Sequence, residues 1–172
     1  LHRSDVADLN QRARLHLIAN DRLGPVVLNS EDLELRVGDR VLALRNDRKI
    51  GIVNGTVATV TGAGPEAVQV ETSDGDRLAL PIDYVAAGHL THGYAMTIHK
   101  SQGMTCDVAL VLGDDTLHKE AGYTSITRGR ERNHVYAVAR QEPAARPADD
   151  LRRALAVCTA KQTAHDRGGL GL

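Results

Sequence analysis

The middle of the chain alternates between short apolar runs and turn dipeptides, and this pattern constrains the fold more than any other feature of the sequence. Four such runs lie between residues 36 and 81, at 41–44, 57–60, 68–70 and 78–80. Asn54-Gly55 and Asp74-Gly75 permit the positive φ angles of tight turns, and Asp74-Gly75 lies between two alternating runs, which is a hairpin signal. The simplest assembly of these short strands is a small antiparallel barrel.

The segments on either side of this region have other periods. Before it, apolar residues recur at steps of three and four, at Val6, Leu9, Ala13 and Leu17. This spacing predicts a helix with Ser4 as its N-cap and an end between residues 20 and 25. After it, the runs at 108–112 and 135–139 are wholly apolar. Such runs are typical of strands in a parallel sheet that helices cover on both faces, although periodicity alone does not separate them from buried helix.

Length and composition fit a globular protein. A chain of 172 residues with 42% hydrophobic residues has the size of one average domain or two small ones and can bury a core. Residues 143–147 resemble a linker, and 149–161 are predicted to form a last helix with Leu151, Leu155 and Cys158 on one face.

Composition also excludes several classes of function. Lys plus Arg number 21 and Asp plus Glu 22, for a net charge of −1, so any anion-binding site must be local. Four tyrosines without Phe or Trp disfavour a platform of several stacked rings. Cys106 and Cys158 form no CxxC, so neither a disulfide framework nor a thiolate zinc site is expected. Because the sequence has no leader and no apolar run near about 18 residues, we expect a cytoplasmic protein without membrane contact.

The most informative segment, residues 94–107, reads YAMTIHKSQGMTCD and leads directly into an apolar run. Gly103 in this segment lets backbone approach a ligand closely. Donors suited to phosphate or to a nucleic-acid backbone precede it, namely His99, Lys100, Ser101 and Gln102. The residue types alone also fit an ordinary polar loop at a strand edge.

A second segment, residues 122–138, reads GYTSITRGRERNHVYAV. Arg128, Arg130 and Arg132 lie close together here, and Glu131 is the only acid among them. Arginine binds phosphate with two parallel hydrogen bonds, whereas an ordinary solvated face more often mixes Lys and Glu. A structural cluster of ion pairs is the competing interpretation.

Together, TIHKSQG at 97–103 and YTSITRGR at 123–130 resemble the fifth and sixth signature motifs of superfamily 1 DNA helicases. The resemblance is to the RecD-like branch, which includes the helicase part of conjugative relaxases of the TraA and TraI type. MTCD after the fifth motif favours the relaxase side. Between 38 and 60, GDRVLALRND and then GIVNGTVATV are similar to the stretch that leads into a small inserted barrel in this branch. Less specifically, HRSDVADLN at 2–10 is similar to the segment around the fourth motif, and the resemblance covers residues 1–140.

The resemblance implies a fold class and a division of the chain. The fold would be α/β, with a partial RecA-like parallel sheet and flanking helices, interrupted by a small antiparallel barrel of the Src-homology-3 type. Residues 1–35 would begin the second RecA-like motor lobe, 36–88 would form the inserted barrel, and 89–140 would complete the lobe with the fifth and sixth motifs. Residues 141–172 would form a linker and a C-terminal helix.

The resemblance also implies roles in nucleotide chemistry. Arg128 falls where the family places an arginine on the γ-phosphate of ATP, a finger that neutralises charge developing in phosphoryl transfer. Arg130 is the second basic residue of the motif and would bind nucleotide together with Gly103. Arg3 matches the arginine near the fourth motif. Many relatives hold the ribose with a glutamate where this chain has Thr105.

Single-stranded DNA is the partner that the resemblance implies for the fifth motif. In the family this loop lines the strand path, and the matching residues here are Thr97, His99, Lys100, Gln102 and Gly103. Arg45 and Arg48, with Lys49, give the predicted barrel a local basic edge that would also contact DNA.

The resemblance covers only part of a motor. A complete helicase of this family needs a GxxxxGK[ST] loop for phosphates and an acidic pair for magnesium, and this sequence contains no Gly-Lys dipeptide. We therefore expect a parent protein that uses ATP and magnesium to move along and unwind DNA in plasmid conjugation. The chain alone would hold no cofactor and be inactive. Its partner would be the N-terminal P-loop lobe of the same parent, from which it is either an excised piece or a truncated product.

Other classes of function compete with this interpretation. His89, His92 and His99 with Cys106 lack the paired spacings of structural zinc sites, so no metal site is expected. No GxSxG nucleophile elbow is present. Two alternatives stay open: a single-strand-binding barrel without catalysis, and a degenerate motor lobe that serves as a protein-docking domain. DNA binding that is indifferent to ATP would favour the first, and absence of DNA and nucleotide binding would favour the second.

Overall fold

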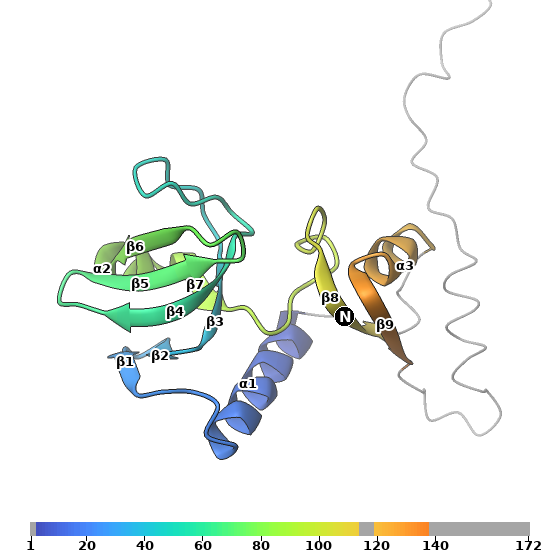
Figure 1. Cartoon of the computed structure of the whole chain (residues 1–172), viewed down its shortest axis with the longest axis horizontal. Helices are drawn as coiled ribbons and strands as arrows, with labels where there is room; N and C mark the ends of the chain where they lie inside the picture. Colours follow the sequence, from blue (N-terminus) through green and yellow to red (C-terminus); the bar gives the residue numbers. More distant parts are fainter. Residues whose placement is uncertain (1–2, 114–118, 138–172) are drawn as a thin grey trace, which may run out of the picture. The chain divides into compact units, whose positions relative to one another are not determined.

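A computed structural model describes residues 3–113 and 119–137 of the chain (Figure 1). The described residues divide into two compact units, one formed by residues 3–100 and the other by residues 101–113 and 119–137. The predicted linker and the predicted last helix lie outside the described residues, as does the end of the apolar run at 135–139. Among the helices that are described, none is long and apolar enough to cross a membrane.

Helix α1 (Arg3–Ala19) opens the first unit. Ser4 lies inside the first turn, so the prediction that it caps the helix is wrong, because the helix starts before the apolar period that marked it. At the other end, the Arg22 N–H donates to the Leu17 carbonyl at 2.9 Å. Asp21 takes φ +52°, the left-handed conformation that commonly ends a helix.

Five antiparallel strands form the main sheet of the first unit. They are paired in the order β6-β5-β4-β3-β7, with bounds β3 (Arg40–Ala43), β4 (Val57–Ala63), β5 (Ala67–Thr72), β6 (Arg77–Pro81) and β7 (Leu90–His92). In β5, Val68 and Val70 are buried while Gln69 between them is exposed, as strand geometry requires of a sheet with one covered face. The predicted turn at Asp74-Gly75 joins β5 to β6, with Gly75 at φ +89°.

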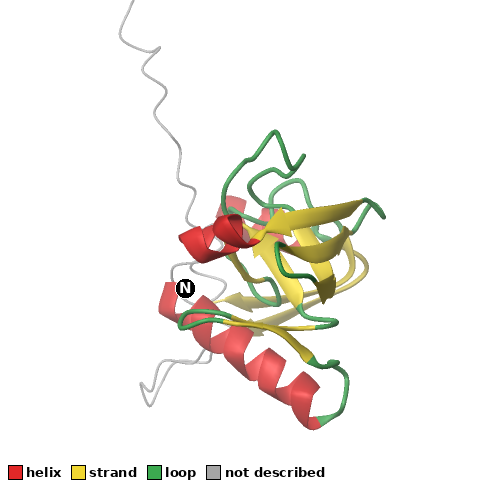
Figure 2. Ribbon diagram, turned by 90° about the vertical axis from the view of Figure 1, so that its left-hand side faces the viewer, coloured by secondary structure: helices red, strands yellow, loops and turns green. Residues whose placement is uncertain are grey.

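Shorter elements complete this unit. A two-stranded ladder of β1 (Val26–Asn29) and β2 (Glu34–Arg36) precedes the sheet, and α2 (Ile82–Tyr84) with the π-helix η1 (Val85–His89) connects β6 to β7. Figure 2 shows α1 as the longest helix, beside the strands of the unit. The edge strands β6 and β7 do not pair with each other. Closure of the sheet into a Src-homology-3-like barrel therefore stays a prediction.

The core of the first unit is mainly aliphatic, as expected of a chain without Phe or Trp. Its largest fully buried apolar side chains are Leu35, Leu80, Val41, Val60, Val68 and Val70. Tyr84 is the aromatic member of this core.

The second unit contains β8 (Cys106–Gly113), α3 (Lys119–Ile126) and β9 (Gly129–Ala137). β8 and β9 are parallel, and α3 lies between them in the chain, so the described residues form a mixed α/β structure with several sheets. The expectation of strands buried on both faces is wrong for the described residues. Leu110 is 68% exposed and Val135 43%, because two strands and one helix cannot cover both faces of a sheet.

Candidate functional site

Arg128 lies in the turn between α3 and β9, and its side chain is half-buried. Its guanidinium donates from Nε to the Thr124 carbonyl at 2.8 Å, from Nη1 to the Met104 carbonyl at 3.1 Å, and from Nη2 to Thr127 Oγ1 at 3.1 Å. Nη1 and Nη2 each carry a second N–H group, which an anion such as phosphate can accept. Within the described part of the chain, Arg128 forms no ion pair with Glu131 or another acid.

The contact between Arg128 and Met104 connects the segment that matches the sixth motif with the end of the fifth. The Met104 N–H donates to the Ser101 carbonyl at 3.1 Å, which closes a tight turn in which Gly103 takes φ +80°. Backbone shape rather than lack of space requires this glycine, since no atom lies near the position of an added Cβ. The Cys106 N–H donates to the Arg128 carbonyl at 3.0 Å, so the backbone of the arginine is also fixed.

Arg130 and Arg132 lie on β9, near a bulge at the start of that strand. Gly129 has no room for a side chain there, because an added Cβ would overlap the Arg132 carbonyl oxygen. The Asn133 side chain completes the bulge: its Oδ1 accepts from the Gly129 N–H at 2.9 Å and its Nδ2 donates to the Gly129 carbonyl at 3.0 Å. Arg130 Nε lies 3.6 Å from Asp107 Oδ1, but both side chains are about 70% exposed, so Arg130 stays accessible.

The remaining residues matched to the fifth motif divide between the two units. Thr97 is half-buried, and its carbonyl accepts from the Lys100 N–H at 3.0 Å, which closes a turn at the end of the first unit. The side chains of His99 and Lys100 in this turn are exposed. Gln102 and Gly103 belong to the second unit and are exposed.

Arg45 and Arg48 lie apart from these turns, on the loop between β3 and β4, and both are exposed. The Tyr84 hydroxyl donates to the Arg45 carbonyl at 2.6 Å. Arg45 Nη1 lies 3.1 Å from His89 Nε2. The core therefore anchors the base of the loop, while the loop presents its cations to solvent.

Sequence reasoning missed a buried polar cluster in the first unit. The Asp39 side chain is fully buried, and its carboxylate accepts from Arg14 Nε, the Tyr94 hydroxyl and the Arg36 N–H at 3.1, 2.7 and 2.7 Å. Arg14 Nη2 also donates to Glu34 Oε1 at 2.6 Å. Asp39 belongs to the stretch GDRV, but a Gly-Asp dipeptide indicates a turn and gives no sign of burial.

Asn10 is a second missed residue, although it ends the stretch that resembles the fourth-motif region. It is 7% exposed. Its Oδ1 accepts from the N–H groups of Tyr94 and Ala95 at 2.8 and 3.0 Å. Its Nδ2 donates to the carbonyls of Ala95 and Val6, each at 2.9 Å. No periodicity or spacing could have indicated the contacts with Tyr94 and Ala95, because these residues are 84 and 85 positions away.

The cluster shifts the pKa of several of its groups. Burial, together with the hydrogen bond to Asp39, raises the pKa of Tyr94 to about 12. Burial lowers the pKa of His92, whose Nε2 lies 3.0 Å from the Glu34 carbonyl oxygen. The hydrogen bond from Arg14 lowers the pKa of the Glu34 carboxyl. At neutral pH, therefore, the tyrosine and histidine are neutral while the arginine and glutamate are charged.

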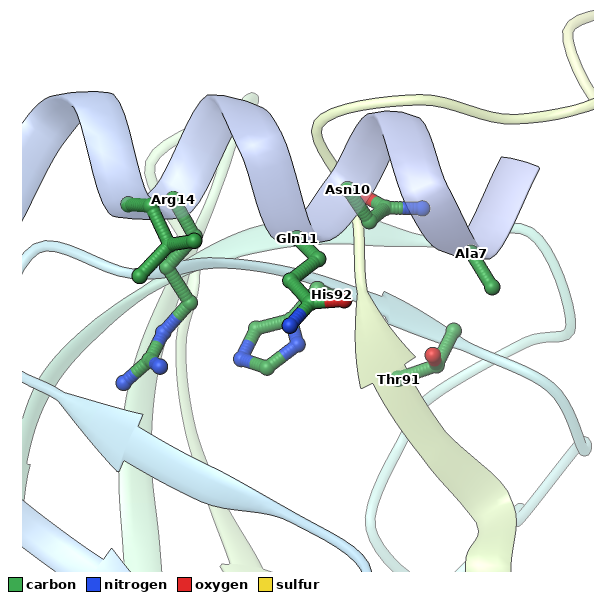
Figure 3. A pocket seen from close by; sticks show the side chains of 7 residues that line it. Ala7, Asn10, Gln11, Arg14, Thr91 and His92 are labelled. Atoms are coloured by element: carbon green, nitrogen blue, oxygen red, sulfur yellow. The ribbon is translucent and has the colours of Figure 1, made fainter. Parts of the chain in front are cut away.

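A shallow pocket of about 240 Å³ opens between α1 and β7, beside this cluster. Figure 3 shows Gln11 and Arg14 extending from α1 into the pocket, with Asn10 on the same helix and His92 and Thr91 opposite. Hydrogen bonds within the protein already engage three of these side chains, so the pocket does not indicate a ligand. Among the residues that the structure describes, no group of three or more His, Cys, Asp or Glu side chains could hold a metal ion.

Comparisons with known proteins support the resemblance. No model of a known protein family matches the chain. The chain is 36% identical over 138 residues to the conjugal transfer protein TraA of Agrobacterium fabrum, across 78% of this chain and 12% of TraA. It is 27% identical over 124 residues to the multifunctional conjugation protein TraI of Escherichia coli, across 69% of this chain and 7% of TraI. With the ATP-dependent RecD2 DNA helicase of Deinococcus radiodurans it shares 32% identity over 103 residues, across 58% of this chain and 14% of RecD2.

A solved structure shows the same fold. The Pif1 helicase from Bacteroides, crystallised with ADP-AlF3 and single-stranded DNA, matches 81% of this chain and 39% of its own with a TM-score of 0.57 and 23% identity. The chain thus spans only a small part, 7 to 14%, of the three curated relatives named above. The predicted resemblance to a C-terminal part of a superfamily 1 helicase, with TraA, TraI and RecD-type relatives, is confirmed.

Proposed function

We propose that this chain, which is similar to part of the TraA and TraI conjugation proteins and of a RecD-type helicase, is the C-terminal motor-lobe part of an ATP-dependent DNA helicase from a conjugative relaxase. It would supply an arginine finger and part of the path for single-stranded DNA. One observation carries the proposal: Arg128 is bonded to the Met104 carbonyl, directly after the Gly103 turn. A single hydrogen bond thus joins the segment proposed to meet ATP with the segment proposed to meet DNA.

The chemistry of the proposed finger follows from the contacts of Arg128. Negative charge develops on the γ-phosphate during transfer, and a planar guanidinium can neutralise it with two parallel hydrogen bonds. Rotation of the guanidinium toward a phosphate would exchange the Met104 carbonyl for a phosphate oxygen. Loss of that bond would free the Met104 carbonyl at the end of the Gly103 turn, which would connect the nucleotide to the DNA path. The exposed Arg130 would add a second positive charge.

The nucleotide would lie between this lobe and an N-terminal P-loop lobe of the same parent. Arg128 fits a phosphate oxygen, whereas no cluster in the described part of this chain fits magnesium, so the phosphate loop and the magnesium-binding acids would come from the other lobe. The division at 1–35, 36–88, 89–140 and 141–172 remains part of the proposal. Support for the RecA-like lobe and the inserted barrel comes from the parallel β8–β9 pair, the antiparallel sheet and the fold shared with Pif1.

The DNA path would use the exposed turn at the end of the first unit and the loop between β3 and β4. The proposed contacts come from Thr97, His99, Lys100, Gln102, Arg45 and Arg48. Because few cations converge and no set of stacked rings accompanies them, the affinity of the chain for single-stranded DNA should be micromolar or weaker.

Fluorescence anisotropy with a labelled oligothymidylate tests this proposal. The affinity should fall with salt at a slope of about 0.7 per neutralised phosphate, and replacing both Lys100 and Arg48 by Ala should weaken binding for all sequences alike. A matched control replaces Arg12 and Arg77, whose side chains are 75% and 85% exposed and lie outside the proposed path. Unchanged affinity in the Lys100 and Arg48 variant, or equal loss in the control, would remove these residues from the path.

A single-strand-binding module without catalysis is the second candidate. The exposed cations on the loop between β3 and β4 of an antiparallel sheet favour it. The two functions differ in the longer parent protein: a motor changes its DNA affinity when ATP is added, whereas a binding module does not.

A further inference from the structure

The segment before the fifth motif is held by a side chain that acts as a neighbouring strand would. Asn10 Oδ1 accepts from the Ala95 N–H and Asn10 Nδ2 donates to the Ala95 carbonyl, so one side-chain amide satisfies both backbone groups of a residue. The same Oδ1 accepts from the Tyr94 N–H. Because Asn10 is almost fully buried, its replacement would leave these backbone groups without partners and away from water.

The side chain of Tyr94 provides a second attachment. Its hydroxyl donates to Asp39 Oδ1 at 2.7 Å and accepts from the Arg40 N–H at 3.3 Å. Asp39 is in turn bonded to Arg14, which lies one helical turn after Asn10 on the same face of α1. Backbone and side chain of Tyr94 are therefore both tied to α1, the first directly through Asn10 and the second through Asp39.

The residue before Tyr94 is fixed as well. Gly93 N–H donates to the Arg40 carbonyl at 2.7 Å. Its backbone lies so close to β3 that an added Cβ would be 2.8 Å from the Val41 carbonyl carbon. Residues 93–95 are thus held by α1 and by β3 at once.

These attachments end where the exposed motif begins. Thr97 follows Ala95 by two positions, and the side chains of His99 and Lys100 after it are exposed. A loop whose start is fixed loses less conformational freedom when it binds a ligand than one whose start is mobile. The geometry points to Asn10 and Tyr94 as positioning residues that set the conformation of residues 97–100 and thereby the affinity of this turn for single-stranded DNA. The inference rests on the proposed DNA-binding function of the turn, although neither residue need touch DNA.

Three variants of the 172-residue chain test the inference. Asn10→Ala removes the whole amide, Asn10→Asp keeps the acceptor but replaces the donor to the Ala95 carbonyl by an oxygen, and Tyr94→Phe removes a single hydroxyl. Asn20→Ala is a matched control in the turn directly after the same helix, because the Asn20 side chain is exposed and donates to the His16 carbonyl. Tyr136→Phe, on β9, is the control for Tyr94→Phe.

Two readouts are needed, the amide NMR signals of residues 97–100 and the anisotropy of a labelled oligothymidylate. We expect Asn10→Ala and Asn10→Asp to shift these amide signals and to weaken DNA binding by about tenfold or more, the loss that one or two buried hydrogen bonds produce. Tyr94→Phe should act in the same direction by roughly threefold to tenfold, and it decides the question if the Asn10 variants do not fold. The two controls should change neither readout.

The outcomes separate this inference from the proposed function. The inference would be overturned, and the proposed function left intact, if the variants shift signals only at residues 94 and 95 and keep a DNA affinity within about twofold of the unmodified chain. An unmodified 172-residue chain that binds no DNA would contradict the proposed function. The amide signals would then decide the positioning role alone, and unchanged signals at 97–100 would overturn it as well.

Discussion

Arg14 Nε lies 3.1 Å from both carboxylate oxygens of Asp39, a side chain without exposed surface. Removing the arginine would leave a buried carboxylate without its cation, so Arg14→Ala should lower the free energy of unfolding by about 3 to 5 kcal/mol. The surface pair of Arg12 and Asp8, with side chains 75% and 55% exposed, provides the control. Arg12→Ala should cost only about 0.3 to 0.5 kcal/mol. Urea unfolding of both variants measures the difference, and similar small losses for both would contradict the account of the cluster.

Because of Tyr94, the free energy of unfolding should depend on pH in the alkaline range. Its pKa in the folded protein is about 12, and in the unfolded chain it is near the ordinary value of about 10. The neutral phenol is therefore favoured by folding. This contribution is fully present below pH of about 10 and is lost as the pH rises through about 12. Burial also raises the pKa of Tyr84. The pH dependence of the stability of the unmodified chain must therefore be compared with that of Tyr94→Phe.

The measurement is urea unfolding of the unmodified chain and of Tyr94→Phe at several pH values across this window. The gap in stability between the two proteins should narrow toward high pH, and absorbance titration of the variant should lack the phenol that ionises near pH 12. A gap that stays constant would show that the phenol is not held neutral by the fold.

Gly129 should tolerate no side chain. An added Cβ meets the Arg132 carbonyl oxygen within the bulge, so Gly129→Ala should destabilise the second unit by about 1 to 3 kcal/mol, as overpacking does. Gly64→Ala is a suitable control, because its nearest neighbour is the flexible end of Gln69 at 3.7 Å. Amide hydrogen exchange of β8 and β9 reports the change. Equal protection in both variants would mean that the bulge does not need its glycine.

The isolated chain should release phosphate from ATP only at the background rate. Its sequence contains no Gly-Lys dipeptide and hence no GxxxxGK[ST] loop to hold the phosphates. A phosphate-release assay with and without magnesium tests this expectation. Magnesium-requiring turnover that scales with the concentration of the purified chain would contradict it.

Local patterns predicted those parts of the fold that depend on local chemistry. The Asp74-Gly75 turn joins β5 to β6 because glycine adopts the required φ, and the alternation around Gln69 identifies which face of β5 is covered. The start of β9 was missed, since an arginine-rich stretch does not resemble a buried strand. It is a strand nonetheless, because Gly129 and Asn133 form a bulge that pairs it with β8.

The sequence predicted which residues belong to the candidate site, through its two motifs, but not which groups those residues contact. The spacing of TIHKSQG and YTSITRGR led to Arg128, and the competing interpretation, a cluster of ion pairs, placed its partners among nearby acids. In the structure the partners are neutral oxygens: two nearby, from Thr124 and Thr127, and the Met104 carbonyl, 24 positions away. Likewise Asp39 is buried only because Arg14 and Tyr94, which are 25 and 55 positions away, neutralise and bond it. Pairings of this kind depend on tertiary structure, which residue types and periods do not encode locally.

The role of Arg128 can be tested only in the longer parent protein, where the proposed cleft would be complete. A finger acts mainly on the transition state, so Arg128→Ala should leave nucleotide affinity within about a few fold while lowering turnover by roughly 10³ to 10⁵. Arg128→Lys should restore little of the turnover, because lysine keeps the charge but lacks the planar guanidinium that can donate two parallel hydrogen bonds. Arg132→Ala serves as the matched control and should retain nearly normal turnover, because Arg132 is exposed on β9 and lies two residues after the end of YTSITRGR.

The contacts of Arg128 offer a purely structural explanation, in which the guanidinium only ties the end of α3 to the Met104 turn. That explanation predicts lower thermal stability for Arg128→Ala with nearly normal hydrolysis. Single-turnover ATP hydrolysis by the folded Arg128→Ala parent, with its nucleotide affinity and melting temperature measured on the same sample, separates the two. The proposed finger predicts a rate at least about 10³ lower with nucleotide still bound, and a rate within about tenfold of the unmodified protein would contradict it.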